Sequence, residues 1–294
     1  MKFVTAVREE ERFIGVVKNE AVINVSALAA SDGKKVARTL LEGIQQGEAF
    51  TSAVHHLMNT ANASEYTYQL EEVQLLAPIP RPSKNVFCIG KNYRDHAIEM
   101  GSEADVPENI MVFSKAPTAI IGHEEGIPSH SNITNQLDYE GELAVVIGKT
   151  GTGINEAEAM DHVFGYTIIN DITARDLQQK HKQFLLGKSL NGTCPMGPWI
   201  VHHSEISNPE NLMIETKVNG EVRQKGNTSD FIFDIRTMIT ELSKGMTLEA
   251  GDIIATGTLA GVGKGMKPPV FLKAGDTIEI TVEGIGTLRN EIVE

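Results

Sequence analysis

Short apolar runs separated by polar turns recur along the chain, and most have the length and composition of β-strands. The pair Asn219-Gly220 separates two such runs and predicts a tight β-hairpin, because this dipeptide favours a two-residue turn. Apolar residues with helical spacing occur in fewer segments. The predicted strands cover residues 2–7, 12–17, 21–25, 85–89, 136–148, 162–170, 212–218, 221–224, 248–255, 271–280 and 281–288. The predicted helices cover residues 36–44, 50–58, 94–100 and 234–242.

The first part of the chain differs from the rest in what it lacks. Residues 1–75 combine short strands with two helical segments, as in a small α/β domain, but hold no cluster of catalytic residue types. The proline-rich segment 78–82 has an extended bias and is typical of a connector. We therefore expect a small N-terminal domain over residues 1–75 and a larger domain over residues 76–294.

Three carboxylates stand near the ends of two apolar strands. Glu140 and Glu142 lie in the predicted strand 136–148, where residues i and i+2 share a face, and Asp171 follows the strand 162–170. Buried carboxylates repel one another unless a cation balances them, and hard divalent ions prefer oxygen ligands. This arrangement predicts a site for Mg²⁺ or Mn²⁺. The alternative is that Glu140 and Glu142 form the solvent face of an edge strand.

Basic residues close to these segments offer further chemistry. On the predicted helix 94–100, His96 and Glu99 share a face, and a carboxylate that orients an imidazole makes a general base. A surface His-Glu pair is the alternative. Lys188 lies between apolar and small residues and could face an anionic ligand. Arg175, near the start of another helix, could balance the acidic cluster or form a structural ion pair.

Two loops and one compact segment complete the pattern. Residues 101–109 are polar and acidic, as in a mobile lid. The glycine-rich segment 255–265 matches neither the P-loop nor the GxGxxG pattern, but its backbone N–H groups and threonine hydroxyls could bind a small carboxylate. Residues 190–198 are interpreted as turn and core.

Composition narrows the function classes. The chain has 294 residues and a formal net charge of -13, which argues against non-specific binding to nucleic acid or an anionic membrane. Its two cysteines, Cys88 and Cys194, form no CxxC pattern, which fits a reducing compartment. No apolar stretch approaches the ~20 residues of a spanning helix, and the N-terminal residues lack the apolar core of a signal peptide. We expect a cytoplasmic protein.

Taken together, these segments resemble the fumarylacetoacetate hydrolase family. The similarity runs in family order over residues 76–294, and the first 75 residues are similar to the variable N-terminal domain of many members. The subgroup that the chain resembles includes acylpyruvate hydrolases and oxaloacetate decarboxylases. The segments that carry the resemblance are residues 89–100, 138–148, 165–178, 187–190 and 256–258.

The resemblance implies an α+β fold that is mostly β, with a mixed β-roll and few helices, and a homodimer. It also implies Mg²⁺ or Mn²⁺ bound by Glu140, Glu142 and Asp171. One departure is Leu259, where many members have proline. The other roles that it implies are a His96–Glu99 dyad, the active-site lysine Lys188, and substrate-binding or supporting residues at Arg175, Gln178 and Thr258.

The activity that the resemblance implies is metal-dependent cleavage of the C–C bond at C3 of a small 2-oxo acid, through a metal-stabilised pyruvate enolate. Oxaloacetate decarboxylation and acylpyruvate hydrolysis both fit. Two alternatives remain: an isomerase or decarboxylase of hydroxy-dienoic diacids from aromatic catabolism, and a non-catalytic binding or scaffold protein. Catalysis by a cysteine is a further rival, although Cys88 lies in an apolar strand typical of inert core.

Overall fold

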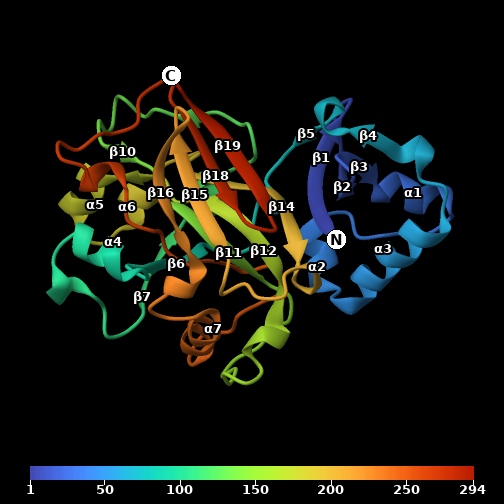
Figure 1. Ribbon diagram of the computed structural model, residues 1–294. Coiled ribbons are helices and arrows are strands. Elements are labelled where there is room, and N and C mark those ends of the chain that lie inside the picture. Colours follow the sequence, from blue (N-terminus) through green and yellow to red (C-terminus); the bar gives the residue numbers. More distant parts are fainter.

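The computed structural model describes residues 1–294, with a smaller N-terminal unit beside a larger body (Figure 1). The three N-terminal strands expected from the sequence are confirmed, but the first helix was missed. The second helix starts at Leu40 instead of Val36, because the Thr39 hydroxyl caps it by accepting a hydrogen bond from the Glu42 N–H. The unit contains β1 (Lys2–Arg8), β2 (Glu11–Lys18), β3 (Ala21–Asn24), α1 (Val25–Ser31), α2 (Leu40–Gln45), α3 (Glu48–Thr60), β4 (Thr67–Gln69) and β5 (Gln74–Leu75).

One twelve-stranded sheet runs through both parts of the molecule. Its strands follow the order β4-β3-β2-β1-β14-β12-β11-β17-β6-β7, with β5 beside β1 and β8 beside β14. β1 joins the larger body by pairing with β14 at Lys2 and Phe3. The strands from the larger body are β6 (Val86–Gly90), β7 (Met111–Lys115), β8 (Ile120–Ile121), β11 (Gly141–Ile147), β12 (Val163–Asn170), β14 (Cys194–His202) and β17 (Ile253–Ala255).

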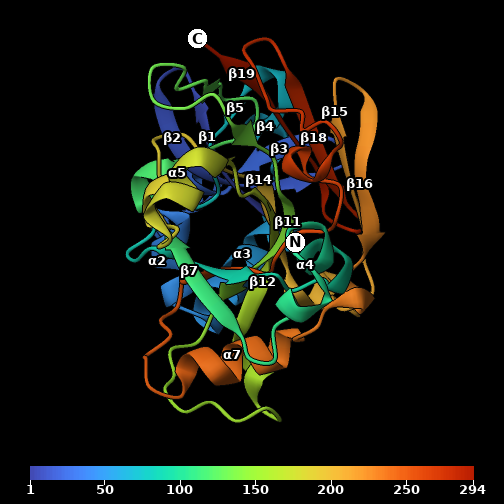
Figure 2. The same cartoon turned by 90° about the vertical axis from the view of Figure 1, so that its left-hand side faces the viewer.

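A second sheet of five strands, ordered β16-β15-β18-β19-β9, and a two-strand ribbon of β10 and β13 complete the strands. Figure 2 turns the side carrying α4, α5 and β7 toward the reader. The fold is therefore α+β and mostly β. The remaining elements are α4 (Arg94–Glu99), β9 (Ile127–Pro128), β10 (Leu137–Asp138), β13 (Thr173–Ala174), α5 (Arg175–His181), α6 (Leu185–Lys188), β15 (Met213–Val218), β16 (Glu221–Asn227), α7 (Ile235–Ser243), β18 (Thr277–Val282) and β19 (Gly286–Val293).

Several predicted boundaries were wrong. The segment 136–148 is not one strand: Leu137 and Asp138 pair with β13, whereas β11 begins at Gly141 and pairs with β12. Residues 190–198, interpreted as turn and core, contain the start of β14, which keeps its sheet pairing despite two prolines. The strand expected over 248–255 is reduced to Ile253–Ala255, since Gly251 turns with a φ of 97°.

The last two strands also lie later than expected. The sequence predicted strands over 271–280 and 281–288, but the chain turns between Val282 and Gly286, where Gly284 has a φ of 75°. This turn gives β18 and β19 their antiparallel register, with Val282 opposite Gly286. Apolar alternation continued through both segments, so the pattern did not mark the turn.

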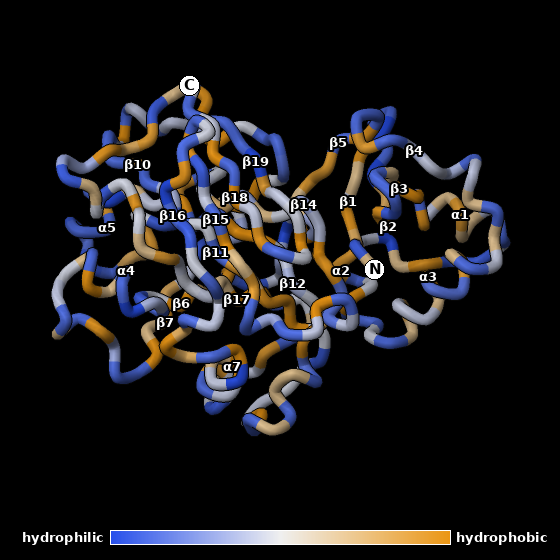
Figure 3. Tube along the Cα trace, in the orientation of Figure 1, coloured by the Kyte–Doolittle hydropathy of each residue, from blue (hydrophilic) through white to orange (hydrophobic).

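The two parts of the molecule share a hydrophobic core. Phe3 is fully buried, and its ring centroid lies 5.6 Å from those of both Phe50 and Phe164. Apolar segments concentrate along the central strands (Figure 3). The boundary near residue 75 stays a prediction. No helix is both long and apolar enough to cross a lipid bilayer.

Gly165 on β12 allows β12 and β14 to approach one another closely. A methyl group at this position would meet the Val201 carbonyl oxygen at 2.2 Å, so the alanine requires β14 to move. We expect Gly165→Ala to lower the free energy of unfolding by about 1–3 kcal/mol, as overpacked cores do. Urea unfolding followed by Trp199 fluorescence measures this. Gly245→Ala is the control, since a methyl group added there would have no atom within 4 Å; equal losses in the two variants would contradict the close approach.

Candidate active site

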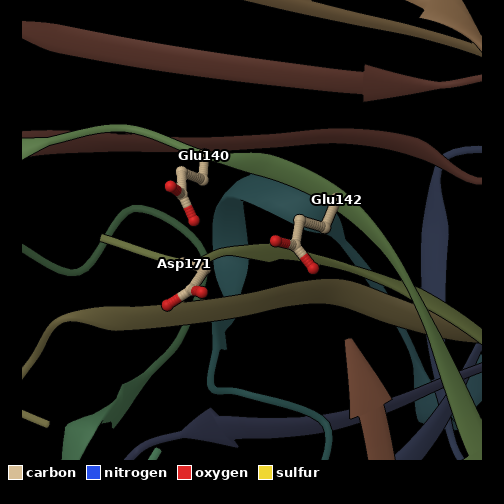
Figure 4. Close-up of side chains that lie close together, drawn as sticks. All are labelled: Glu140, Glu142 and Asp171. Carbon is tan, nitrogen blue, oxygen red and sulfur yellow. The ribbon is translucent and has the colours of Figure 1, made fainter. Parts of the chain in front are cut away.

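Three buried carboxylates converge where β11 begins and β12 ends. Glu140 precedes β11, Glu142 lies within it, and Asp171 follows β12; all three are at most 4% exposed. The Asp171 N–H donates to the Glu140 carbonyl at 2.8 Å, so the two segments hold one another in place. One ligand atom from each residue lies within 4.8 Å of the others, and the carboxylates turn toward a common centre (Figure 4).

Three buried cations surround this cluster. Lys188 Nζ lies 2.6 Å from Glu140 Oε2 and 2.7 Å from Asp171 Oδ2, so one ammonium links two of the acids. Arg175 reaches Glu140 Oε1 at 2.7 Å. Lys115 Nζ lies 2.8 Å from Asp171 Oδ1, outside hydrogen-bonding alignment, and donates instead to the Ile172 carbonyl at 2.9 Å.

The balance of charge leaves one acid without a cation. Burial would raise the pKa of Glu140, but Lys188 and Arg175 outweigh it and hold that pKa below its ordinary value. Glu142 has no ion pair and accepts one hydrogen bond, from the Gly257 N–H at 2.8 Å. Burial, and then the charges of Asp171 and Glu140, raise the pKa of Glu142 well above its ordinary value.

These features fit a divalent cation. The donor set consists of carboxylate oxygens, which suit a hard ion, and Asp171 Oδ1 accepts no hydrogen bond although it is buried. A doubly charged ion would stabilise the ionised form of Glu142, which has no cationic partner in the protein. The alternative of a solvent-facing pair at Glu140 and Glu142 is wrong, because both side chains are buried.

His96 and Glu99 lie together on α4. His96 Nδ1 is 3.4 Å from Glu99 Oε2, at the long end of a hydrogen bond, and the His96 ring is buried. Glu99 Oε1 accepts from the Gly261 N–H at 2.9 Å, which fixes the carboxylate against the glycine-rich loop. With Nδ1 directed to Glu99, the imidazole keeps Nε2 free of protein partners.

One cavity of about 300 Å³ brings the dyad and the metal ligands together. Lys91, Lys182 and Lys264 add positive charge to its wall. Glu99 and Asp171 do not line the cavity. They contact residues that do: Glu99 contacts His96, and Asp171 contacts Lys188. Of the residues expected at the site, His96, Glu140, Glu142, Arg175, Gln178, Lys188 and Thr258 line the cavity.

The residues expected to bind substrate differ in how many of their polar groups already have hydrogen-bond partners in the protein. Arg175 donates to Asp138 Oδ2 at 2.8 Å and to Gln178 Oε1 at 3.3 Å, in addition to its contact with Glu140. The Thr258 hydroxyl donates to the Gly141 carbonyl at 3.0 Å and accepts from Gln224 Nε2 at 2.7 Å. Their polar groups are thus largely used by the protein, whereas the amide nitrogen of Gln178 has no protein partner. Substrate binding by these residues stays a prediction.

Sequence reasoning missed three residues that build the site. Lys115 ends β7, and a lone basic residue after an apolar run was its only signal. Asp138 accepts from the N–H groups of Gly263 and Lys264 at 2.7 and 3.0 Å, and so anchors the glycine-rich loop. Gln224 accepts from the Gly141 N–H at 3.0 Å, and nothing in its local sequence distinguishes it.

The cysteines do not form a nucleophilic site. Cys88 and Cys194 are both fully buried. Burial raises the pKa of each thiol, that of Cys194 to about 12, so neither supplies a thiolate near neutral pH. The interpretation of Cys88 as inert core is confirmed.

Comparisons with known proteins agree with this geometry. The family model "Fumarylacetoacetate (FAA) hydrolase C-terminal" matches residues 85–293. The chain is 55% identical over 300 residues to the oxaloacetate tautomerase YisK of Bacillus subtilis, covering 99% of this chain and 100% of that protein. A fumarylacetoacetate hydrolase structure from Exiguobacterium antarcticum is 44% identical with a TM-score of 0.86, covering 100% and 99% of the two chains. Maleylpyruvate hydrolase from Sphingobium sp. SYK-6, crystallised with Mn²⁺ and pyruvate, is 28% identical with a TM-score of 0.80 and the same coverage.

Glu142→Gln separates the electrostatic strain of the triad from its metal affinity. The amide keeps an oxygen for the Gly257 N–H but cannot ionise, so it removes the acid whose charged form is disfavoured by burial and by its neighbours. We expect the variant to melt at a higher temperature than the parent in EDTA, yet to bind Mn²⁺ at least about 100-fold more weakly. Thermal unfolding with and without metal, and calorimetric titration with Mn²⁺, measure the two effects. Glu283→Gln, at an exposed site, is the control; unchanged Mn²⁺ affinity in Glu142→Gln would contradict the metal site.

Proposed function

This chain is an enzyme of the fumarylacetoacetate hydrolase family, and we propose that it acts on oxaloacetate, interconverting its keto and enol forms. The observation that carries the proposal is the single cavity shared by the His96–Glu99 dyad and the buried carboxylates. A base beside a polarising site is the arrangement that proton abstraction next to a carbonyl requires. The 55% identical relative named oxaloacetate tautomerase supports this substrate.

Glu140, Glu142 and Asp171 would hold the cofactor, Mg²⁺ or Mn²⁺. When bound, that ion would supply Lewis-acid polarisation of the 2-oxo group and neutralise part of the substrate's negative charge. The 28% identical relative crystallised with Mn²⁺ and pyruvate supports a divalent ion and a 2-oxo acid as ligands of this protein.

The charge and size of the cavity favour a small diacid. Lys91, Lys182 and Lys264 line the wall. Lys91 is paired with Asp105 Oδ1 at 3.1 Å, so Lys182 and Lys264 offer ammonium groups to a second carboxylate beyond the reacting carbons. The cavity volume of about 300 Å³ lies at the low end for ligand sites, which suits a four-carbon diacid better than larger hydroxy-dienoic diacids.

The dyad supplies the proton transfer. Glu99 accepts a hydrogen bond from His96 Nδ1–H and so directs Nε2 toward the ligand. His96 Nε2 removes the proton from C3, the C–H electron pair forms the C2=C3 double bond, and the carbonyl electrons move to the 2-oxo oxygen. His96 then delivers the proton to that oxygen, which completes the enol. The reverse sequence returns the keto form.

Lys188 prepares the site without changing its own protonation. Burial would lower its pKa, but Asp171 and Glu140 outweigh burial and raise it. Lys188 therefore stays an ammonium, with two N–H groups donating to those carboxylates and a third left for the developing charge on the 2-oxo oxygen. The Phe113 ring lies 4.7 Å from Nζ and excludes water from that side.

Tautomerisation breaks no C–C bond, unlike the decarboxylation and hydrolysis that the sequence resemblance implied. Decarboxylation would place the same electron pair on the same 2-oxo oxygen, but with CO₂ leaving in place of the C3 proton. Acylpyruvate hydrolysis would need His96 to activate water instead. The role of His96 therefore distinguishes these reactions. A cytoplasmic homodimer without nucleic-acid or membrane partners completes the proposal, supported by the net charge of -13 and the family resemblance.

The dyad can be tested by isosteric substitution. We expect His96→Gln to lower kcat for oxaloacetate tautomerisation by about 10²–10⁴-fold, since the base is lost, while Mn²⁺ affinity stays within a factor of two. Glu99→Gln should lose less activity, because it leaves the imidazole in place. Ultraviolet absorbance of the enol follows the reaction, and coupled detection of pyruvate measures decarboxylation in the same samples. His55→Gln, on the exposed face of α3, is the matched control.

Two results would contradict the proposal. Wild-type protein with Mn²⁺ that accelerates pyruvate formation but not enol decay would make decarboxylation the reaction instead. Turnover of acetylpyruvate, but not oxaloacetate, that is lost in His96→Gln would assign C–C hydrolysis.

A further inference from the structure

A second pocket lies where the N-terminal unit meets the connector to the larger body. Its volume is about 150 Å³, and it shares no lining residue with the catalytic cavity. Three arginines, Arg12, Arg38 and Arg81, line it together with an apolar floor that includes Phe13 and Ile79. No carboxylate lines this pocket, although acidic residues outnumber basic ones by 39 to 26 in the chain.

These arginines are distinguished by having no partner within the protein. Five of the nine arginines in the chain form ion pairs with carboxylates: Arg8, Arg94, Arg175, Arg223 and Arg289.

A sixth arginine, Arg236, donates to the Glu156 carbonyl at 3.2 Å. Arg12, Arg38 and Arg81 make neither an ion pair nor a side-chain hydrogen bond to the protein, and all three line the same pocket. All three are exposed. In a protein of net charge -13, carboxylates are plentiful, so a concentration of unpaired guanidinium groups around one pocket points to an anion from outside.

The backbone holds the three side chains on separate supports. Arg12 lies on β2 opposite Val7. The Arg38 N–H donates to Glu42 Oε2 at 3.0 Å, which fixes the residue just before the cap of α2. Arg81 stands between two prolines, Pro80 and Pro82, which restrict its backbone. These supports limit the conformational entropy that a ligand would have to remove from the backbone.

The connector itself is anchored to the N-terminal unit. The Thr5 hydroxyl donates to the Pro78 carbonyl at 2.7 Å in a buried hydrogen bond. The connector continues into β6, whose Ile89 and Gly90 line the catalytic cavity. A molecule bound to all three arginines would therefore join the N-terminal unit to the segment that leads to the active site.

We propose that this pocket binds a small phosphorylated molecule with an apolar portion. A guanidinium group binds phosphate oxygens in a bidentate manner, and three of them match a multiply charged group better than a single carboxylate. The apolar floor accounts for the rest of the ligand. The volume of about 150 Å³ limits the buried part of the ligand to a phosphate and one small apolar group, which favours a small molecule over a macromolecular surface. This site does not depend on the proposed oxaloacetate chemistry.

Phenyl phosphate is a suitable probe, because it combines a phosphate with a planar apolar group. We expect full-length protein with Mg²⁺ to bind it saturably by calorimetric titration at constant ionic strength, and more tightly than inorganic phosphate. Each of Arg12→Gln, Arg38→Gln and Arg81→Gln should weaken binding by about tenfold or more. Arg236→Gln is the matched control, since it removes an arginine charge elsewhere and should leave the affinity unchanged. Thermal unfolding checks that every variant is folded.

The triple Arg→Gln variant separates this pocket from the cationic catalytic cavity, which it leaves intact. Loss of the saturable phenyl phosphate binding, with oxaloacetate turnover retained, supports the proposal. The same affinity in the triple variant as in the wild type would overturn it, because the probe would then occupy the catalytic cavity. An equal loss in Arg236→Gln would also overturn it, since only the overall charge would matter. A triple Arg→Lys variant that binds as tightly as the wild type would contradict bidentate recognition.

Discussion

The buried contact of Lys188 with Glu140 and Asp171 is the interaction on which the site depends. Placing carboxylates in a protein interior is costly, and removing one partner of a buried pair leaves an uncompensated charge that costs about 3–5 kcal/mol. A single ammonium meets this constraint for two acids that flank different strands, Glu140 before β11 and Asp171 after β12. Lys188 is the last residue of α6, which packs beside β7 and β13, and this packing places Nζ between the carboxylates.

The break in the strand before Gly141 gives the neighbouring acids different partners. If residues 136–148 formed one continuous strand, Asp138, Glu140 and Glu142 would share a face and compete for the same cations. Instead, Asp138 binds Arg175 and the glycine-rich loop, while Glu140 is shared by Arg175 and Lys188. Glu142 is left with one backbone donor and no cation, so it is the cavity-lining acid whose ionised form most needs a further positive charge.

The sequence allowed the chemistry of the site to be predicted better than its support. Glu140, Glu142 and Asp171 could be predicted because carboxylates in or after apolar strands conflict with burial unless a cation is present. Lys115 and Gln224 could not, because their roles arise from contacts with Asp171 and Gly141, which lie far away along the chain. The start of β14 was missed for a similar reason: its pairing with β12 overrides the local preference of proline and glycine for turns.

The two groups of cations in this protein differ in what compensates them. Around the triad, Lys188 and Arg175 are fixed by carboxylates of the chain, so their positions follow from folding and serve the geometry of the acids. Arg12, Arg38 and Arg81 have no such partners, and folding gains no ion pair from placing them around one hollow. All three are exposed, whereas the half-buried Arg8 and Arg223 pair with glutamates. An external anion would supply the partner that the chain does not provide, and a ligand is therefore the simplest explanation for their placement around one pocket.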